Sequence, residues 1–353
     1  MSDLSQFHKG RGALTNPPNR FETIHYAPDH ENAPDDSAPS TLFLRDPTRQ
    51  IITRNDSPDV SFETSLNPYR GCEHGCIYCF ARPTHEYLGF SAGLDFETKI
   101  LVKENAPELL REELSSPSWK PQPVAMSGVT DPYQPIEKSL QLTRRCLQVL
   151  AEFRNPVFII TKNQLVARDV DVLGELAQYN ASAVYMSITT LDFDVSRKME
   201  PRTSTPDLKL AAIETLARGG VPVGVMVAPI IPGLTDHEMP AILQAAASAG
   251  ATSAAYTVLR LPFAVKTIFE AWLEEHFPDR RDKVLNRVRD LRQGRLNDPR
   301  FHTRAKGEGV FAEQIRSLFA VACRRAGIAG HHTELSSDSF RRPDGPQMSL
   351  FGL

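Results

Sequence analysis

The sequence predicts an α/β protein: a partial, open (β/α)6 barrel with an extended N-terminal arm and a helical C-terminal appendage. Two observations predict this fold. Short apolar stretches rich in β-branched residues alternate with segments of helical spacing that run for ten to sixteen residues, a pattern typical of parallel strands joined by helical crossovers. The alternation repeats about six times, which is too few for a closed eight-stranded barrel.

The expected elements follow in order along the chain. Residues 1–60 are rich in Pro, Asn, Asp and Ser and lack sustained periodicity, so we expect an extended, partly disordered arm. We expect a core at 61–262, a helical appendage at 263–335 and a flexible tail at 336–353. In the core, strands are expected at 97–103, 122–128, 156–161, 183–189, 221–230 and 252–259, and helices at 105–115, 138–153, 164–179, 206–219 and 236–249. In the appendage, helices are expected at 264–276, 280–293 and 308–326.

Composition indicates the compartment. The chain has 353 residues, of which 41% are hydrophobic, enough for a sizeable core. No apolar run of about eighteen residues occurs and the first residues lack an apolar signal region, so we expect no membrane span and no secretory leader. Five cysteines are too few for a disulfide framework, and Cys146 and Cys323 are expected to be isolated buried thiols. We therefore expect a cytoplasmic protein with no membrane partner.

The other three cysteines lie within eight residues, as Cys72, Cys76 and Cys79. This C-x3-C-x-aromatic-C spacing places three thiolates where they can ligate three irons of a [4Fe–4S] cluster, whose usual ligands are cysteines. With no fourth cysteine nearby, one iron would stay open to a small molecule. The alternative is a zinc site that His74 or His85 completes, because structural zinc takes four ligands.

Polar or Gly/Pro-rich loops follow four of the expected strands, at 127–132, 161–163, 187–190 and 229–233. The carboxyl ends of parallel strands share one edge of a sheet, and ligands bind at that edge. We therefore expect these loops to converge on the three cysteines.

The segment 280–306 has a strong basic excess. It contains ten Lys or Arg against three Asp, a local charge of +7 that leaves −10 for the rest of a chain whose net charge is −3. Such an excess predicts a phosphate-binding surface and hence a nucleic-acid partner. The alternative is an ordinary solvated helix face.

Together these residues resemble the radical S-adenosylmethionine (SAM) superfamily, over roughly residues 65–262. In that family SAM chelates the open iron of the cluster, and reduction cleaves its sulfonium to a 5′-deoxyadenosyl radical. The resemblance implies that Cys72, Cys76 and Cys79 hold a [4Fe–4S] cluster and that Tyr78 packs near the adenine of SAM. It also implies an external electron donor of the flavodoxin or ferredoxin type.

The resemblance implies further SAM contacts. The family's Gly-Gly-Glu-type loop after the second strand is altered here to residues 127–131, SGVTD, so backbone carbonyls near Gly128 and the hydroxyls of Ser127 or Thr130 would make the contacts. Ser187 ends the fourth core strand, where the family places a serine on the ribose or carboxylate of SAM.

Arg202 lies in a stretch, 199–230, that is similar to spore photoproduct lyase, a member of the same superfamily. The resemblance makes Arg202 a carboxylate clamp, because a guanidinium pairs bidentately with a carboxylate. The alternative is a surface ion pair with Glu200 or Asp207. The lyase transfers hydrogen through a cysteine in its second-strand loop and a tyrosine after the third cluster cysteine. Gly128 and Phe80 hold these positions here, so we expect a bacterial relative of that lyase and not a true spore photoproduct lyase.

The C-terminus carries a second motif, Gln347-x-Ser349-Leu350-Phe351. It resembles the short peptide by which bacterial replication and repair proteins bind the DNA sliding clamp. In that peptide the Gln side chain forms hydrogen bonds, and Leu and Phe fill an apolar pocket. Such a tail gains affinity by tethering. The alternative is that Leu350 and Phe351 fold back onto the protein.

Three functions follow from these observations. The leading one is a radical SAM enzyme, lyase-like or a transferase, that acts on nucleic acid or in DNA repair. A second is radical modification of a peptide or small metabolite. A third is a non-enzymatic zinc or redox protein that the tail tethers to the sliding clamp.

Overall fold

The computed structural model describes residues 10–22, 39–60, 62–328 and 333–343. Within these ranges the larger sheet has seven strands in the order β10-β9-β8-β7-β6-β3-β2. All neighbours pair in parallel except the edge strand β2, which pairs antiparallel to β3. The strands are β2 (Ile52–Arg54), β3 (Thr64–Leu66), β6 (Val124–Met126), β7 (Val157–Thr161), β8 (Ser182–Ser187), β9 (Val223–Ile230) and β10 (Ser253–Val258). Because β10 and β2 remain unpaired edges, the sheet is open, which confirms the predicted partial barrel.

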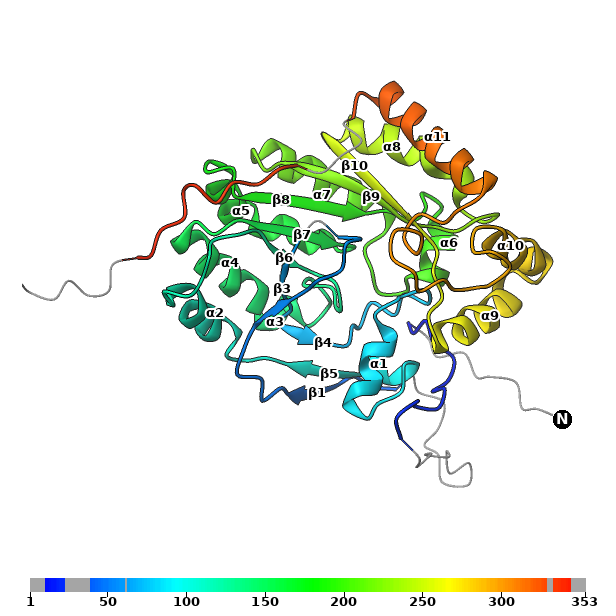
Figure 1. Cartoon of the computed structure of the whole chain (residues 1–353), viewed down its shortest axis with the longest axis horizontal. Coiled ribbons are helices and arrows are strands. Elements are labelled where there is room, and N and C mark those ends of the chain that lie inside the picture. The colour runs from blue at the N-terminus through cyan, green and yellow to red at the C-terminus, as the bar shows by residue number, and fades with distance from the viewer. Residues whose placement is uncertain (1–9, 23–38, 61, 329–332, 344–353) are drawn as a thin grey trace, which may run out of the picture.

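Helices connect the parallel strands and cover the sheet (Figure 1). They are η1 (Arg82–Leu88), α1 (Leu94–Thr98), α2 (Ala106–Ser115), α3 (Glu137–Leu140), α4 (Leu142–Phe153), η2 (Gln164–Asp169), α5 (Val170–Ala177), α6 (Phe193–Met199), α7 (Pro206–Arg218), η3 (Asp236–Glu238) and α8 (Met239–Ser248). Parallel pairing requires such crossovers, because the chain must return to the same end of the sheet. Every residue of β8 is buried, as expected of a parallel strand that other elements cover.

The first predicted strand belongs to a different sheet. The segment 97–103 forms β5 (Lys99–Val102), which lies between β1 (Leu42–Arg45) and β4 (Tyr69–Arg70) in a sheet of three strands within the described residues. The first parallel strand of the larger sheet is β3 instead. With three residues, β3 is too short to give a periodic signal. The predicted arm also contributes β1 and β2, because an extended segment satisfies its backbone groups by pairing with a sheet.

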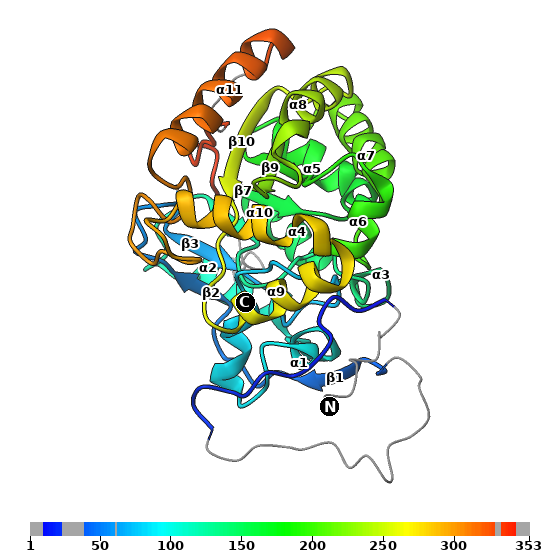
Figure 2. The same cartoon turned by 90° about the vertical axis from the view of Figure 1, so that its right-hand side faces the viewer.

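The C-terminal appendage packs on the core at two places. Helix α11 (Val310–Ala326) lies along α8, while α9 (Ala264–His276) and α10 (Pro278–Asp290) pack together near the start of η1 (Figure 2). Leu261 and the fully buried Trp272 share a hydrophobic cluster with Cys76 and Tyr78. The appendage therefore completes the core around the cysteine-rich segment. Within the described part of the chain, no helix is both long and apolar enough to cross a membrane.

Candidate functional site

The three cysteines lie on a loop between β4 and η1, called here the cysteine loop (residues 71–81). Cys72 and Cys76 are buried, and Cys79 is partly buried. Gly71 and Gly75 adopt φ values of 78° and 69°, a region that favours glycine and lets the loop turn tightly. Backbone hydrogen bonds from Cys72 N to the carbonyl of residue 96 (2.9 Å) and from residue 77 to the carbonyl of residue 199 (3.1 Å) fix the loop to its neighbours.

The three thiols influence one another. Burial raises the pKa of Cys76 well above that of a free thiol, and the Glu200 carboxylate and the other two cysteines raise it further, whereas the Lys162 ammonium lowers it. Burial also raises the pKa of Cys79. Because the thiolate is the form that binds metals, ionising three neighbouring thiols requires positive charge among them. The donor set therefore fits a metal cluster held by three cysteines.

The arrangement fits a cluster better than a single zinc ion. Among the described residues, no three His, Cys, Asp or Glu side chains surround one point as ligands of one ion. His74 Nδ1 lies 3.4 Å from Asp131 Oδ2, and its Nε2 lies 3.2 Å from Asn163 Nδ2. The ring of His85 packs against the aromatic rings of residues 90 and 96. Neither predicted histidine completes a Cys3His site here, whereas each cysteine of a cubane binds an iron of its own.

A buried ion pair stabilises the cysteine loop. Arg82 and Glu97 are both fully buried and form a salt bridge. Arg82 Nε also donates to the carbonyl of Cys76 at 3.0 Å, and its Nη1 donates to the carbonyls of Ala92 and Gly93 at 3.2 and 2.9 Å. Arg82 thereby holds the middle cysteine at a fixed position relative to α1.

The N-terminal segment 10–22 covers the other side of the loop. Gly12 N and Ala13 N donate to the Glu97 carboxylate at 2.9 and 2.8 Å, and Arg11 Nη1 donates to the Glu97 carbonyl at 2.9 Å. A Cβ on Gly12 would stand 1.7 Å from the carbonyl oxygen of Gly75. In Figures 1 and 2 this dark blue segment runs past α1 and α9. It therefore encloses the cysteine loop together with the appendage.

His74 links the cysteine loop to the carboxyl ends of the strands. Although burial disfavours the charged ring, the Asp131 carboxylate and Cys72 raise the pKa of His74 to about 10. Asp131 also accepts from Thr161 Oγ1 (2.7 Å) and Lys162 N (2.8 Å) at the end of β7. These contacts confirm the predicted convergence on the cysteine loop for two of the four strand-end loops, 127–132 and 161–163.

Lys162 places a cation beside the cysteines. Its Nζ donates to Ser187 Oγ at 2.6 Å and to the Ala228 carbonyl at 3.2 Å, and it lies 5.7 Å from the centre of the Tyr78 ring. The predicted site residue Ser187 ends β8 and also donates to the Ala228 carbonyl at 3.1 Å. The ends of β7, β8 and β9 thus present an ammonium, a hydroxyl and a carbonyl next to the cysteine loop.

Tyr78 is buried within the cysteine loop and its hydroxyl donates to Glu200. Burial alone would raise the pKa of Glu200, but the ammonium groups of Lys209 and Lys162 lower it to about 2. Lys209 Nζ donates to Glu200 Oε2 at 2.6 Å, and Thr189 Oγ1 donates to Oε1 at 2.6 Å. This buried network fixes the orientation of the Tyr78 ring.

The other predicted SAM contacts, Ser127, Gly128 and Thr130, differ in their surroundings. Ser127 and Gly128 follow β6, and a Cβ on Gly128 would meet no atom within 4 Å. Thr130 Oγ1 donates to the Gly71 carbonyl at 2.6 Å, so this hydroxyl holds the residue before Cys72.

Arg202 has neither of its expected ion-pair partners. Its Nη1 lies 3.1 Å from Glu73 Oε1, and its backbone N donates to the His74 carbonyl at 3.3 Å. The alternative prediction of an ion pair with Glu200 or Asp207 was wrong. Glu200 is buried and pairs with Lys209 instead. Arg202 therefore faces the cysteine loop.

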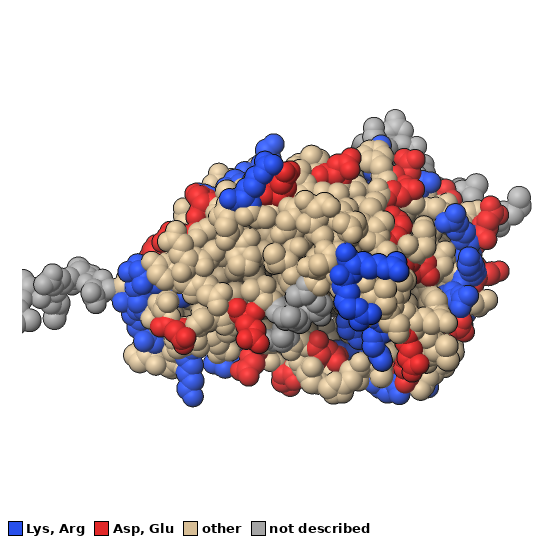
Figure 3. Space-filling view, turned by 90° about the horizontal axis from the view of Figure 1, so that it is seen from above, with Lys and Arg blue, Asp and Glu red and all other residues tan. Residues whose placement is uncertain are grey.

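Many cations of the basic segment 280–306 interact with other groups of the protein. Six of its ten cations form side-chain hydrogen bonds or ion pairs inside the protein: Arg281, Arg289, Arg292, Arg300, Arg304 and Lys306. Three of these side chains, Arg281, Arg300 and Arg304, pair with carboxylates, so part of the positive charge of the segment is neutralised within the protein. On the face seen from above in Figure 3, one group of basic side chains is contiguous, and elsewhere basic and acidic side chains are interspersed.

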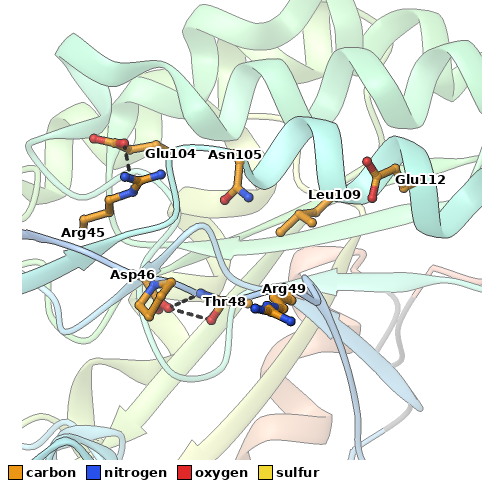
Figure 4. Close-up of a pocket in the computed structure, with 9 residues that line it drawn as sticks. Arg45, Asp46, Thr48, Arg49, Glu104, Asn105, Leu109 and Glu112 are labelled. Carbon is orange, nitrogen blue, oxygen red and sulfur yellow. Dashed lines mark hydrogen bonds and ion pairs between the residues drawn. The ribbon is translucent and has the colours of Figure 1, made fainter.

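A cavity of about 600 Å³ lies between the β1–β2 connection and the start of α2 (Figure 4). It contains no predicted site residue. Arg45 and Glu104 pair at its rim at 3.8 Å, and Asp46 Oδ1 accepts from Thr48. Because the predicted ligands and SAM contacts lie around the cysteine loop and none of them lines this cavity, we assign the site to the cysteine loop. Gln347, Leu350 and Phe351 lie outside the described residues.

Sequence reasoning missed four residues that shape the site: Arg82, Glu97, Lys162 and Glu200. Lys162 follows a predicted strand directly, and its position at the carboxyl edge was a usable signal. Glu97 lies 85 residues from its partner Gly12 in sequence, so no local pattern pointed to it.

Comparisons with known proteins agree with this site. The model of the Radical SAM superfamily matches residues 66–246. An uncharacterised protein of Mycobacterium tuberculosis strain H37Rv is 36% identical over 276 residues, which cover 77% of each chain. An uncharacterised protein of Methanocaldococcus jannaschii is 30% identical over 173 residues, covering 49% of this chain and 62% of that protein. A spore photoproduct lyase variant, solved with bound AdoMet and dinucleoside spore photoproduct, matches with a TM-score of 0.58 and 17% identity over 83% of this chain and 82% of that chain. At that identity the likeness concerns the fold alone.

Proposed function

The chain belongs to the radical SAM superfamily, and from that premise we propose that it is an enzyme that uses a [4Fe–4S] cluster and SAM for radical chemistry on nucleic acid. The observation that carries this proposal is the cysteine loop, which lies at the carboxyl edge of the parallel sheet beside Lys162 and Ser187. When bound, the cluster would supply one electron to the sulfonium of SAM, which then releases a 5′-deoxyadenosyl radical.

The side chains around the loop have separate roles in this proposal. Cys72, Cys76 and Cys79 hold the cluster. The Lys162 ammonium and the Ser187 hydroxyl, 2.6 Å apart, offer a charged and a neutral donor to the SAM carboxylate. Tyr78, oriented by Glu200, presents its ring to the adenine.

We propose three further contacts with SAM, from Ser127, Gly128 and Arg202. Ser127 and Gly128 follow β6, Gly128 borders open space, and both offer backbone groups to the amino end of SAM. Arg202 is a second candidate for the SAM carboxylate, in exchange for its contact with Glu73.

Nucleic acid is the substrate class that the combined observations favour. The lyase of similar fold was solved with a dinucleoside spore photoproduct, and the C-terminal motif resembles a sliding-clamp peptide. Gly128 and Phe80 lack the groups for that lyase's hydrogen transfer, so the proposed reaction on nucleic acid follows a different route. A flavodoxin- or ferredoxin-type protein is the proposed electron donor.

Anaerobic reconstitution with iron and sulfide tests the cluster. We expect about four irons per chain and formation of 5′-deoxyadenosine from SAM after reduction with dithionite. Cys72→Ala should abolish both. Cys146→Ala, which changes a buried cysteine on α4 away from the loop, should retain them. A fully loaded protein that forms no 5′-deoxyadenosine would refute the enzymatic proposal.

A substrate screen tests the nucleic-acid assignment. The yield of 5′-deoxyadenosine is compared with single-stranded DNA, duplex DNA, RNA and a peptide mixture. Nucleic acid should raise the yield, and stimulation by peptides alone would contradict the assignment and favour peptide modification.

A further inference from the structure

Beside the cysteine loop lie two groups of aromatic rings and guanidinium groups, together called here the arginine–aromatic stripe: Phe80 with Arg260, and Phe263 with Arg20, Phe21 and Tyr87. Arg260 Cζ lies 5.1 Å from the centre of the Phe80 ring. Arg20 Cζ lies 3.6 Å from the centre of the Phe263 ring and 5.0 Å from that of Phe21. The rings of Phe21 and Tyr87 stack at 4.9 Å. Each guanidinium of the stripe therefore lies near at least one aromatic ring.

The stripe begins at the cysteine loop. Phe80 follows Cys79 directly, and Tyr87 lies farther along in η1. Arg260 and Phe263 lie three residues apart before α9, which contacts η1. Leu259, next to Arg260, packs in the same hydrophobic cluster as Cys76 and Tyr78. A molecule bound along the stripe would therefore have one end at the proposed radical site.

The aromatic rings of the stripe are unusually exposed. Phe80 is 50% exposed, Phe21 54%, Phe263 60% and Tyr87 73%. Large exposed apolar side chains that gather in one place indicate a binding surface. A ring whose face meets solvent and whose neighbour is a guanidinium is suited to stacking a nucleobase.

Two guanidinium groups at the start of the stripe lack anionic partners. Among the described residues, Arg260 Nε and Arg292 Nη1 are buried without a hydrogen-bond partner. Arg292 is only 1% exposed, and its Nε donates to the Leu259 carbonyl at 3.1 Å. Neither side chain forms a salt bridge in the described structure. Buried charge without a counter-charge is costly unless an anion binds.

The neighbouring charges increase this need for an anion. Burial lowers the pKa of Arg260, and the guanidinium of Arg304 lowers it further. Burial and Arg260 together lower the pKa of Arg292 to about 10. The nearby carboxylates of Asp59 and Asp298 are already bound to Arg304 and Arg300. Positive charge therefore accumulates at the carboxyl end of β10 and is not neutralised by the protein.

We propose that the arginine–aromatic stripe binds a single-stranded segment of nucleic acid, with a backbone phosphate on Arg260 and bases stacked on Phe80 and Phe263. This inference rests on the proposed function, because it assigns the substrate-binding surface of the same enzyme. Phosphate contacts supply affinity without sequence preference, and aromatic rings accept any base. The buried Arg292 guanidinium adds positive charge near that phosphate.

Binding of a fluorescent oligothymidylate of about 12 nucleotides, within the site sizes of single-strand-binding folds, tests the proposal by anisotropy on the reconstituted protein. Phe263→Leu keeps an apolar side chain but removes the ring face, and it should weaken binding roughly 5- to 150-fold, the range for one base stack. Arg260→Gln should weaken binding and reduce the salt dependence of log K by about 0.7, the contribution of one phosphate on a single strand.

The chain offers a matched control pair at the opposite edge of the sheet. Arg154 Cζ lies 4.0 Å from the centre of the Tyr179 ring. Arg154 precedes the amino end of β7, and Tyr179 precedes that of β8. Arg154→Gln and Tyr179→Ala should leave oligonucleotide binding unchanged. Circular dichroism of every variant identifies any that fails to fold, and Arg20→Gln, which keeps a hydrogen-bonding side chain beside Glu86, then replaces a stripe variant that does not fold.

Each outcome decides the proposal. Weakened binding in the stripe variants and not in the controls supports it. Absent binding, or equal binding by all variants, overturns it. Equal competition by thymidine monophosphate would overturn the assignment to a strand, because a free nucleotide would then satisfy the site. Formation of 5′-deoxyadenosine by the unchanged protein is measured in parallel, so that failure of the stripe is distinguished from failure of the radical chemistry.

Discussion

We predict how strongly the buried ion pair of Arg82 and Glu97 stabilises the folded protein. Both side chains are 0% exposed, so neither charge is hydrated when the other is removed. We consider Arg82→Met, Glu97→Met and the double variant. Each single variant leaves one uncompensated buried charge, whereas the double variant leaves none.

The structure sets the magnitude. Removing one partner of a buried ion pair costs about 3–5 kcal/mol, whereas replacing both partners by apolar groups costs far less than the two separate losses. Glu97→Met also leaves the backbone N–H groups of Gly12 and Ala13 without their acceptor, so it should be the more destabilising single change. The double variant should lose no more than about the larger single loss. Against a typical free energy of unfolding of about 5–15 kcal/mol, these are large effects.

Urea unfolding of the metal-free protein, followed by circular dichroism and linear extrapolation, measures these losses. Iron content after reconstitution is a second measurement, and it should fall in Arg82→Met because Arg82 Nε no longer holds the Cys76 carbonyl. The control is the pair of Arg111 and Glu152, whose side chains are 46% and 45% exposed. The same double-mutant cycle there should give a coupling below about 1 kcal/mol.

Two results would refute the reasoning. If the two single losses simply added in the double variant, the charges would not stabilise each other. If the buried pair coupled no more strongly than the exposed pair, burial would not determine the magnitude.

Three more predictions concern other parts of the chain. Gly12→Ala should displace the N-terminal segment and lower iron retention, because its Cβ would stand 1.7 Å from a carbonyl oxygen; iron release to a chelator measures this, and an unchanged rate would contradict the covering role. Lys162→Met should raise the Kd for SAM roughly 10- to 100-fold, the value of a hydrogen bond to a charged group; calorimetry on the cluster-loaded protein measures it, and an unchanged Kd would exclude a contact with SAM. Leu350→Ala with Phe351→Ala should abolish capture of the protein by an immobilised sliding clamp, and equal capture of the unchanged and altered chains would show that the tail is not the binding element.

Local patterns allowed most of the fold to be predicted. The strands from β6 to β10 and the helices between them follow from alternating strand and helix periodicity, because each is long enough to show a period. β3 has only three residues and gave no signal. The prediction that the segment 97–103 belongs to the barrel sheet was also wrong, because β5 lies in a separate sheet. A strand pattern indicates that a segment is extended and not which neighbour it pairs with.

The candidate site was predictable only in part. Cys72, Cys76 and Cys79 were found because the ligands of one cluster are close in sequence. Arg202 was found, but its partner Glu73 was not, since that contact depends on how α6 ends and the chain turns back to the cysteine loop.

The sequence by itself determined the family, the three cluster cysteines and the alternation of strands and helices, because each of these is written in short, local spacing. The tertiary structure alone decided what surrounds the cysteines. Arg82 and Glu97 become a buried pair, Gly12 comes to lie against Gly75, and Arg260 comes to lie over Phe80 only when the chain folds. Electrostatic and packing energies depend on distance in space, and residues far apart in sequence reach these distances only in the folded protein.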